Sequence, residues 1–209
     1  VSYQHVEPWG WVDSNGLVVF DGNDAYLIDT PWSPGDTRQL VDWIEARGAV
    51  LQGSLSTHSH DDRAAGIGYL NATGIPTHAS ELTNQFLARD GKPTAMVGFP
   101  GPEFDWLPGK ITAFHPGGGH TQDNLVVWIH EHHLLVGGCL VRARTANGLG
   151  YTGEATIKTW AESARRVKSK YPEAQMVIPG HGPIGDIQLW EHTASLVESA
   201  RRKGAQGTK

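Results

Sequence analysis

A chain of 209 residues with 39% hydrophobic and 19% charged residues is long enough for one large domain or two small ones around a substantial core. The formal net charge of −5 argues against nucleic acid as a partner, because no basic field is present to gather phosphates. No apolar run approaches the ~20 residues that span a bilayer, and residues 1–10 do not resemble a signal peptide. A cytosolic protein and a mature secreted form therefore both stay open.

Hydrophobic periodicity and turn residues predict a mixed α/β chain in which helices alternate with strands. A block of two strands, helix, strand and helix occurs once in each half, and a loop ends each core strand. Elements in this order suggest sheets covered by helices. In the first half we predict strands 16–20 and 25–30 around the turn 21–24, a helix 36–47, a strand 50–56, a helix 61–71 and a strand 75–79. Ser80 could cap the next helix, which runs to about Arg89. In the second half we predict a loop 92–109, strands 111–114, 124–129 and 134–137, a helix 155–170, a strand 176–179 and a helix 187–203.

A cluster of side chains able to bind metal follows the predicted buried strand 50–56. His58 and His60 point the same way if the backbone is extended, and the turn into the next helix can swing Asp62 toward the same cavity. Imidazole nitrogens and carboxylate oxygens are both good zinc ligands. Three such groups within five residues can hold one metal ion or straddle two.

Three later loops have the same placement beside an apolar strand. His120 follows a run of three glycines, Cys139 comes just after the end of the strand 134–137, and His181 follows the strand 176–179. Glycine lets a backbone approach a metal centre closely. A single histidine is more often a surface residue than a ligand, and a lone cysteine is often only a small buried hydrophobe. Six ligand-type side chains in four similar loops favour a metal centre, and ligation would explain the unpaired Cys139, the only cysteine.

The sequence resembles the metallo-β-lactamases, specifically subclass B1, over nearly its whole length. The resemblance rests on the H-x-H-x-D-R string, residues 116–124, residues 137–141 and the late His181. Relatives in the broader hydrolase superfamily usually have His directly after the Asp and a bridging Asp in place of cysteine. Arg63 and Cys139 stand at those two positions here and favour the subclass.

The resemblance implies a four-layer αβ/βα sandwich formed by residues 1–209 as a single domain of two pseudo-repeated halves. It implies two zinc ions, the first held by His58, His60 and His120 and the second by Asp62, Cys139 and His181. It also implies a secreted, periplasmic protein that confers antibiotic resistance, with a signal peptide outside this chain.

The implied reaction is hydrolysis of the β-lactam ring of penicillins, cephalosporins and carbapenems. A water that bridges two zinc ions loses a proton near neutral pH and would attack the lactam carbonyl, which the first zinc polarises. The second zinc would stabilise the nitrogen as the C–N bond breaks. No covalent intermediate is needed, in keeping with a sequence that has no G-x-S-x-G or S-x-x-K string.

The resemblance also indicates substrate-binding residues. Arg142 replaces the family's usual lysine and would bind the substrate carboxylate, with Arg144 as a substitute or a plain solvated arginine as the alternative. Tyr151 stands where many relatives have an asparagine near the lactam carbonyl, so it either donates an O–H or walls the pocket. Trp9 and Trp11 match the mobile hairpin that closes over substrate, although either could be an ordinary core residue.

Other polar residues receive plainer interpretations. Asp61 and Arg63 are expected to hold the metal-binding loop in place without binding the metal themselves. The stretch 130–133 contains three histidines and is interpreted as a solvated hairpin turn. The histidines without companions, His5, His78, His115 and His192, are read as structural or surface residues.

Two other functions compete with lactam hydrolysis. The first is another superfamily hydrolase acting on thioesters, lactones or phosphoesters, against which Arg63 and Cys139 count. The second is a zinc-binding module with a vestigial site, which is disfavoured because structural zinc sites are usually closed by four protein ligands. A monomer is the default oligomeric state, since no interface stripe is visible in the sequence.

Overall fold

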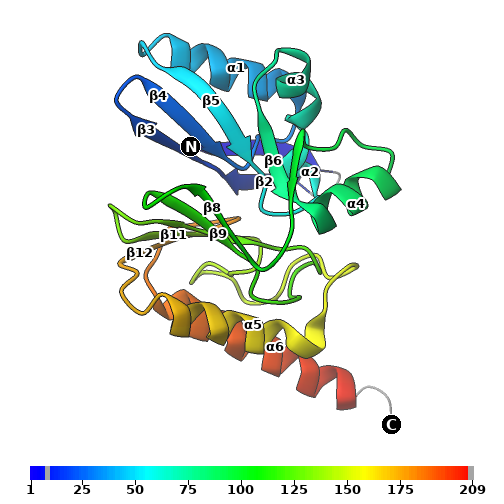
Figure 1. The fold of residues 1–209 in the computed structure, drawn as a ribbon. Helices are drawn as coiled ribbons and strands as arrows, with labels where there is room; N and C mark the ends of the chain where they lie inside the picture. The colour runs from blue at the N-terminus through cyan, green and yellow to red at the C-terminus, as the bar shows by residue number, and fades with distance from the viewer. Residues whose placement is uncertain (8–9, 207–209) are drawn as a thin grey trace. The chain divides into compact units, whose positions relative to one another are not determined.

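A computed structural model describes residues 1–7 and 10–206. The chain divides into two compact units, Val1–Gly101 and Pro102–Lys209. Both units combine one five-stranded sheet with helices, which confirms the predicted mixed α/β class (Figure 1). Within the described residues, no helix is long and apolar enough to span a bilayer.

The first unit holds a sheet in the order β3-β4-β5-β6-β7 and a separate antiparallel hairpin, β1-β2. The strands β3 and β4 pair antiparallel, and the other neighbours in this sheet are parallel. Parallel strands need crossover connections, which the helices supply. The elements are β1 (Ser2–Glu7), β2 (Gly10–Asn15), β3 (Leu17–Asp21), β4 (Asp24–Ile28), α1 (Pro34–Glu45), β5 (Val50–Leu55), α2 (Asp61–Ala64), α3 (Ile67–Ala72), β6 (Thr77–Ser80), α4 (Glu81–Arg89) and β7 (Val97–Phe99).

Local capping explains where two of these helices begin. Ser33 accepts a hydrogen bond from the Asp36 amide at the start of α1. Ser80 accepts one from the Thr83 amide at the start of α4, as the sequence predicts. The buried face of α1 packs Leu40, Val41 and Ile44 into a cluster with residues of β4 and β5. Figure 1 shows α1 and α3 together on one side of this sheet.

The second unit holds a sheet in the order β12-β11-β10-β9-β8, antiparallel except for the β11–β12 pair. Two long helices, α5 and α6, lie side by side against it (Figure 1). Trp160 of α5 and Trp190 of α6 are fully buried in its core. The elements are β8 (Glu103–Leu107), β9 (Ile111–Phe114), β10 (Val126–Ile129), β11 (Leu134–Gly138), α5 (Ile157–Lys170), β12 (Met176–Pro179) and α6 (Gln188–Gln206).

The structure corrects the sequence prediction in two places. The segment 92–109, predicted as loop, contains the short strands β7 and β8, both at sheet edges. The predicted helix 61–71 is two helices, because the chain bends at Gly66. A Cβ atom at Gly66 would stand 2.3 Å from the Thr37 hydroxyl, so the close approach to α1 requires glycine.

Candidate metal centre

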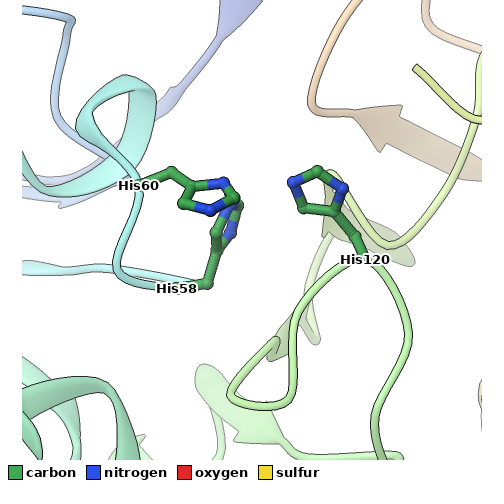
Figure 2. Close-up of side chains that lie close together, drawn as sticks. All are labelled: His58, His60 and His120. Carbon is green, nitrogen blue, oxygen red and sulfur yellow. The ribbon is translucent and has the colours of Figure 1, made fainter. Parts of the chain in front are cut away.

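The first unit brings two predicted ligands together directly after β5. His58 is fully buried, and its Nε2 atom lies 3.2 Å from Nδ1 of His60. The two rings meet edge to face, with centroids 4.8 Å apart (Figure 2). Tetrahedral zinc with bonds of 2.0–2.1 Å separates two nitrogen ligands by about 3.4 Å. The spacing of these two nitrogens therefore fits a shared metal ion.

A buried acidic residue holds the backbone of this loop. Asp29 accepts hydrogen bonds from the Thr57 amide at 2.7 Å and from the Thr57 hydroxyl at 3.0 Å. It is one of two non-glycine residues with positive φ among the described residues, at 64°. Burial raises the pKa of Asp29 to about 6, while the charge of Arg63 and the Thr57 hydrogen bonds oppose the rise. Asp29 thus fixes the residue before His58.

Arg63 joins this carboxylate to the third predicted ligand of the unit. Its guanidinium forms an ion pair with Asp62 at 2.9 Å and another with Asp29 at 3.3 Å, and the arginine is fully buried. The Arg63 carbonyl accepts a hydrogen bond from the Ser56 hydroxyl at 3.0 Å. A carboxylate oriented by a buried arginine is a pre-positioned metal ligand. The predicted supporting role of Arg63 has a direct physical basis in these contacts.

The second unit brings Cys139 and His181 together through its pair of parallel strands. The strands β11 and β12 end side by side, with Gly138 opposite Pro179, and the Gly180 amide donates to the Gly138 carbonyl at 2.7 Å. The next residue of each segment is a predicted ligand. The Sγ atom of Cys139 lies 3.3 Å from Nε2 of His181, and the thiol is buried. Zinc with tetrahedral thiolate and imidazole ligands separates these atoms by about 3.6 Å.

His120 lies on the glycine-rich loop between β9 and β10. The carbonyl of Gly119 accepts a hydrogen bond from the Thr156 amide at 2.8 Å, and the carbonyl of Gly118 accepts one from the Ser163 hydroxyl at 2.8 Å. The His120 ring packs edge to face against Trp160, with centroids 5.9 Å apart. Figure 2 shows the imidazole of His120 rising from this loop. The loop that carries His120 is therefore held by α5.

The predicted substrate-binding residues have diverse surroundings. Trp9 lies outside the described residues, and Trp11 on β2 is 72% exposed. Tyr151 is also exposed, at 63%. The Arg142 guanidinium donates from Nε to the Gly148 carbonyl at 3.2 Å; burial lowers its pKa, against the effect of the charge on Cys139. The substrate roles of all four residues stay predictions.

Two further expectations concern residues around the ligands. Asp61 is more than half exposed and pairs with Lys92 at 2.7 Å, so it ties the metal loop to the segment after α4. The stretch 130–133 is the turn between β10 and β11, as predicted, and His132 is exposed there. His130 instead hydrogen-bonds the Thr112 hydroxyl at 2.8 Å.

Sequence reasoning missed Asp29 and Lys92. Asp29 ends an apolar strand in Leu27-Ile28-Asp29-Thr30, and a charged residue directly after a buried strand was the available signal. Its positive φ and its partner Thr57, 28 residues away, are properties of the folded chain. Lys92 carried no signal within a segment that reads as loop.

Comparison with known proteins gives close relatives along most of the chain, although no family model matches it. A "Metallo-beta-lactamase type 2" of Pseudomonas aeruginosa is 44% identical over 192 residues, covering 92% of this chain and 77% of the relative. A protein of the same name from Bacteroides fragilis is 34% identical, covering 94% of this chain and 80% of the relative.

Solved structures agree. The structure titled TMB-1, concerned with substrate and inhibitor binding, is 53% identical, with a TM-score of 0.93 over 96% of this chain and 92% of that one. The metallo-β-lactamase FIM-1 from Pseudomonas aeruginosa, in a form described as mono-zinc, is 33% identical, with a TM-score of 0.91 over 95% of this chain and 90% of that one. This chain therefore belongs to the subclass B1 metallo-β-lactamases, a family of hydrolases that act on the cyclic amide of β-lactams, and it has their fold.

Proposed function

We propose that this protein hydrolyses the lactam amide of penicillins, cephalosporins and carbapenems with two zinc ions held by six of its side chains. The observation that carries the proposal is the spacing of two donor pairs, His58 with His60 at 3.2 Å and Cys139 with His181 at 3.3 Å. Both distances are close to those that tetrahedral zinc imposes on its ligands.

The donor chemistry supports a division into two sites. His58, His60 and His120 would hold the first zinc, and Asp62, Cys139 and His181 the second. The first unit contributes His58, His60 and Asp62, and the second unit contributes His120, Cys139 and His181. Six ligands shared between two ions leave positions for water and substrate, whereas a structural zinc site is closed by four protein ligands.

When bound, zinc supplies a Lewis acid for the lactam carbonyl and lowers the pKa of water, so that hydroxide is available near neutral pH. The side chains of the protein orient the metal ligands. Arg63 holds the Asp62 carboxylate at 2.9 Å, and Asp29 holds the backbone before His58 at 2.7 Å. Both contacts are buried, so the ligands keep their orientation without help from solvent.

Exposed aromatic residues supply the substrate contacts in this proposal. Trp11 lies on the β1–β2 hairpin next to Val6, and both side chains are largely exposed. An exposed apolar pair on a two-stranded hairpin suits a flap that closes over the substrate. Tyr151 would wall the site or donate its hydroxyl to the lactam carbonyl.

The cellular role follows from this activity. A protein that opens β-lactam rings confers resistance to these antibiotics, and we place its action in the periplasm, as a monomer. Size-exclusion chromatography of the purified protein tests the oligomeric state.

Turnover of one penicillin, one cephalosporin and one carbapenem by zinc-loaded protein tests the proposal. We expect hydrolysis of all three, loss on addition of a chelator, and recovery when zinc is added back. His60→Ala should abolish most of the turnover, and His132→Ala, which removes an exposed histidine of the β10–β11 turn, serves as the matched control. A folded, zinc-loaded protein that hydrolyses a thioester or lactone but no β-lactam would overturn the proposal.

A further inference from the structure

The segment between Cys139 and α5 is held in place from several sides. Its first residues are fixed by α5 and α6, since Trp160 donates to the Leu140 carbonyl at 2.7 Å and the Arg142 amide donates to the Thr193 hydroxyl at 2.8 Å. Further on, the ring of His192 hydrogen-bonds the Ala146 carbonyl at 3.1 Å. These anchors end at residue 146, and the next residues need another support.

The Arg142 side chain supplies that support. Its Nε atom donates to the Gly148 carbonyl at 3.2 Å. The end of the guanidinium covers Gly150, because a Cβ atom there would stand 3.1–3.4 Å from Nη1, Nη2 and Cζ. Gly150 has a φ of 70°, a conformation that glycine adopts without strain. The Arg142 guanidinium therefore packs closely against the backbone at Gly150.

Tyr151 is the next residue, and its side chain lies over the same segment. A Cβ atom on Gly153 would stand 2.3 Å from the Tyr151 hydroxyl and 2.6 Å from Cζ. The far end of the phenol thus lies over Gly153, while the side chain remains 63% exposed. Arg142 packs on Gly150 and the phenol of Tyr151 packs on Gly153, so the arginine and the phenol are linked through the backbone of residues 150–153.

We propose that Arg142 is a positioning residue that clamps Gly148–Gly150 and so fixes where the Tyr151 phenol stands. This role differs from the carboxylate-binding role that the family resemblance implies for the same arginine. Lysine could not replace it fully, because an ammonium group can donate to the Gly148 carbonyl but has no planar end to cover Gly150. The consequence for substrates rests on the proposed function, whereas the clamp itself does not.

Limited digestion with chymotrypsin measures the clamp without any need for catalysis. Cleavage after Tyr151 requires the segment to open locally, and cleavage after the exposed Trp11 of the β1–β2 hairpin gives an internal reference in the same digest. We expect Arg142→Ala to accelerate cleavage after Tyr151 about tenfold relative to Trp11, because a charged donor to a backbone carbonyl is lost. Arg142→Lys should be intermediate.

The matched control is Arg144→Ala, which removes an equal charge from an exposed side chain two residues further on. Its cleavage ratio should equal that of the unaltered protein. An unchanged ratio in Arg142→Ala, or an equal acceleration in Arg144→Ala, would overturn the clamp.

Kinetics then separate positioning from carboxylate binding. The same cephalosporin is compared as its free carboxylate and as its neutral methyl ester. A positioning role predicts that Arg142→Ala lowers kcat/KM by the same factor for both, whereas a loss confined to the carboxylate form, through KM, would contradict it. If no β-lactam is hydrolysed at all, the proposed function fails, and the digestion ratio still decides whether Arg142 is a clamp.

Discussion

Arg63 pairs with Asp62 at 2.9 Å in a region closed to solvent, and the same guanidinium reaches Asp29 at 3.3 Å. One cation therefore balances two buried carboxylates. Replacing it with Arg63→Met keeps most of the volume but leaves uncompensated charge inside the first unit. We expect the free energy of unfolding to fall by about 3–5 kcal/mol.

Urea denaturation of the zinc-free protein measures this loss without interference from metal binding. Arg47→Met is the matched control, because Arg47 lies on the surface with its guanidinium 3.6 Å from the centre of the Trp43 ring. The free energy of unfolding of Arg47→Met should fall by less than about 1 kcal/mol. A similarly small loss for Arg63→Met would contradict the view that this arginine holds the metal loop.

His78 predicts a pH dependence of stability. Burial lowers its pKa from 6.5, and its Nδ1 atom hydrogen-bonds the Ser54 carbonyl at 3.1 Å. The unfolded chain binds a proton near pH 6.5, while the folded protein does so only at lower pH. The contribution of the neutral histidine is therefore fully present above 6.5 and is lost as the pH falls through the lowered folded pKa.

His78→Asn keeps a donor for Ser54 and removes the titration. We expect the free energy of unfolding of the unaltered protein to decrease more than that of the variant between about pH 7.5 and pH 5.5. Urea midpoints at the two pH values, with equal zinc, give the difference. Parallel pH profiles for the two proteins would show that His78 does not contribute.

Gly119 cannot be replaced by a larger residue unless the loop that carries His120 shifts. A Cβ atom there would stand 2.2 Å from Leu140 Cδ1 and 3.0 Å from Trp160 Cδ1, both in the buried core of the second unit. Gly119→Ala should cost about 1–3 kcal/mol and weaken zinc binding, since the loop must shift. Gly148→Ala is the control, because its added methyl group meets no atom within 4 Å. Thermal unfolding and zinc titration check both variants, and equal behaviour would refute the packing argument.

Cys139 permits a chemical test of the second site, because it is the only cysteine of the chain. Its thiol is buried and lies 3.3 Å from His181. Zinc should protect it, so a maleimide should label the zinc-loaded protein at least about tenfold more slowly than the chelated one. His181→Ala should reduce the protection. Equal labelling rates with and without zinc would count against Cys139 as a zinc ligand.

Sequence patterns predicted the elements whose formation depends on local residues. Leu40, Val41 and Ile44 recur on one face of α1, and Ser80 caps α4, as their spacing indicates. The neighbouring ends of β11 and β12 explain why Cys139 and His181 meet, although 42 residues separate them. The loops that carry ligands could be predicted because each lies beside an apolar strand.

Features that depend on distant contacts could not be predicted in this way. The break between α2 and α3 falls at Gly66, where the chain passes close to Thr37 of another helix. The strand β8 lies between proline and glycine residues that read as loop, and its pairing with β9 depends on the folded chain. The hydrogen bond from Arg142 to Gly148 likewise depends on how the intervening residues turn.

Stepwise addition of zinc to metal-free protein, with turnover of a chromogenic cephalosporin and bound zinc measured together, tests the central claim most directly. We predict that turnover rises with bound metal, levels at about two zinc ions per chain, and disappears when a chelator is added. Full turnover by the metal-free protein would contradict the assignment of His58, His60, Asp62, His120, Cys139 and His181 as zinc ligands in catalysis.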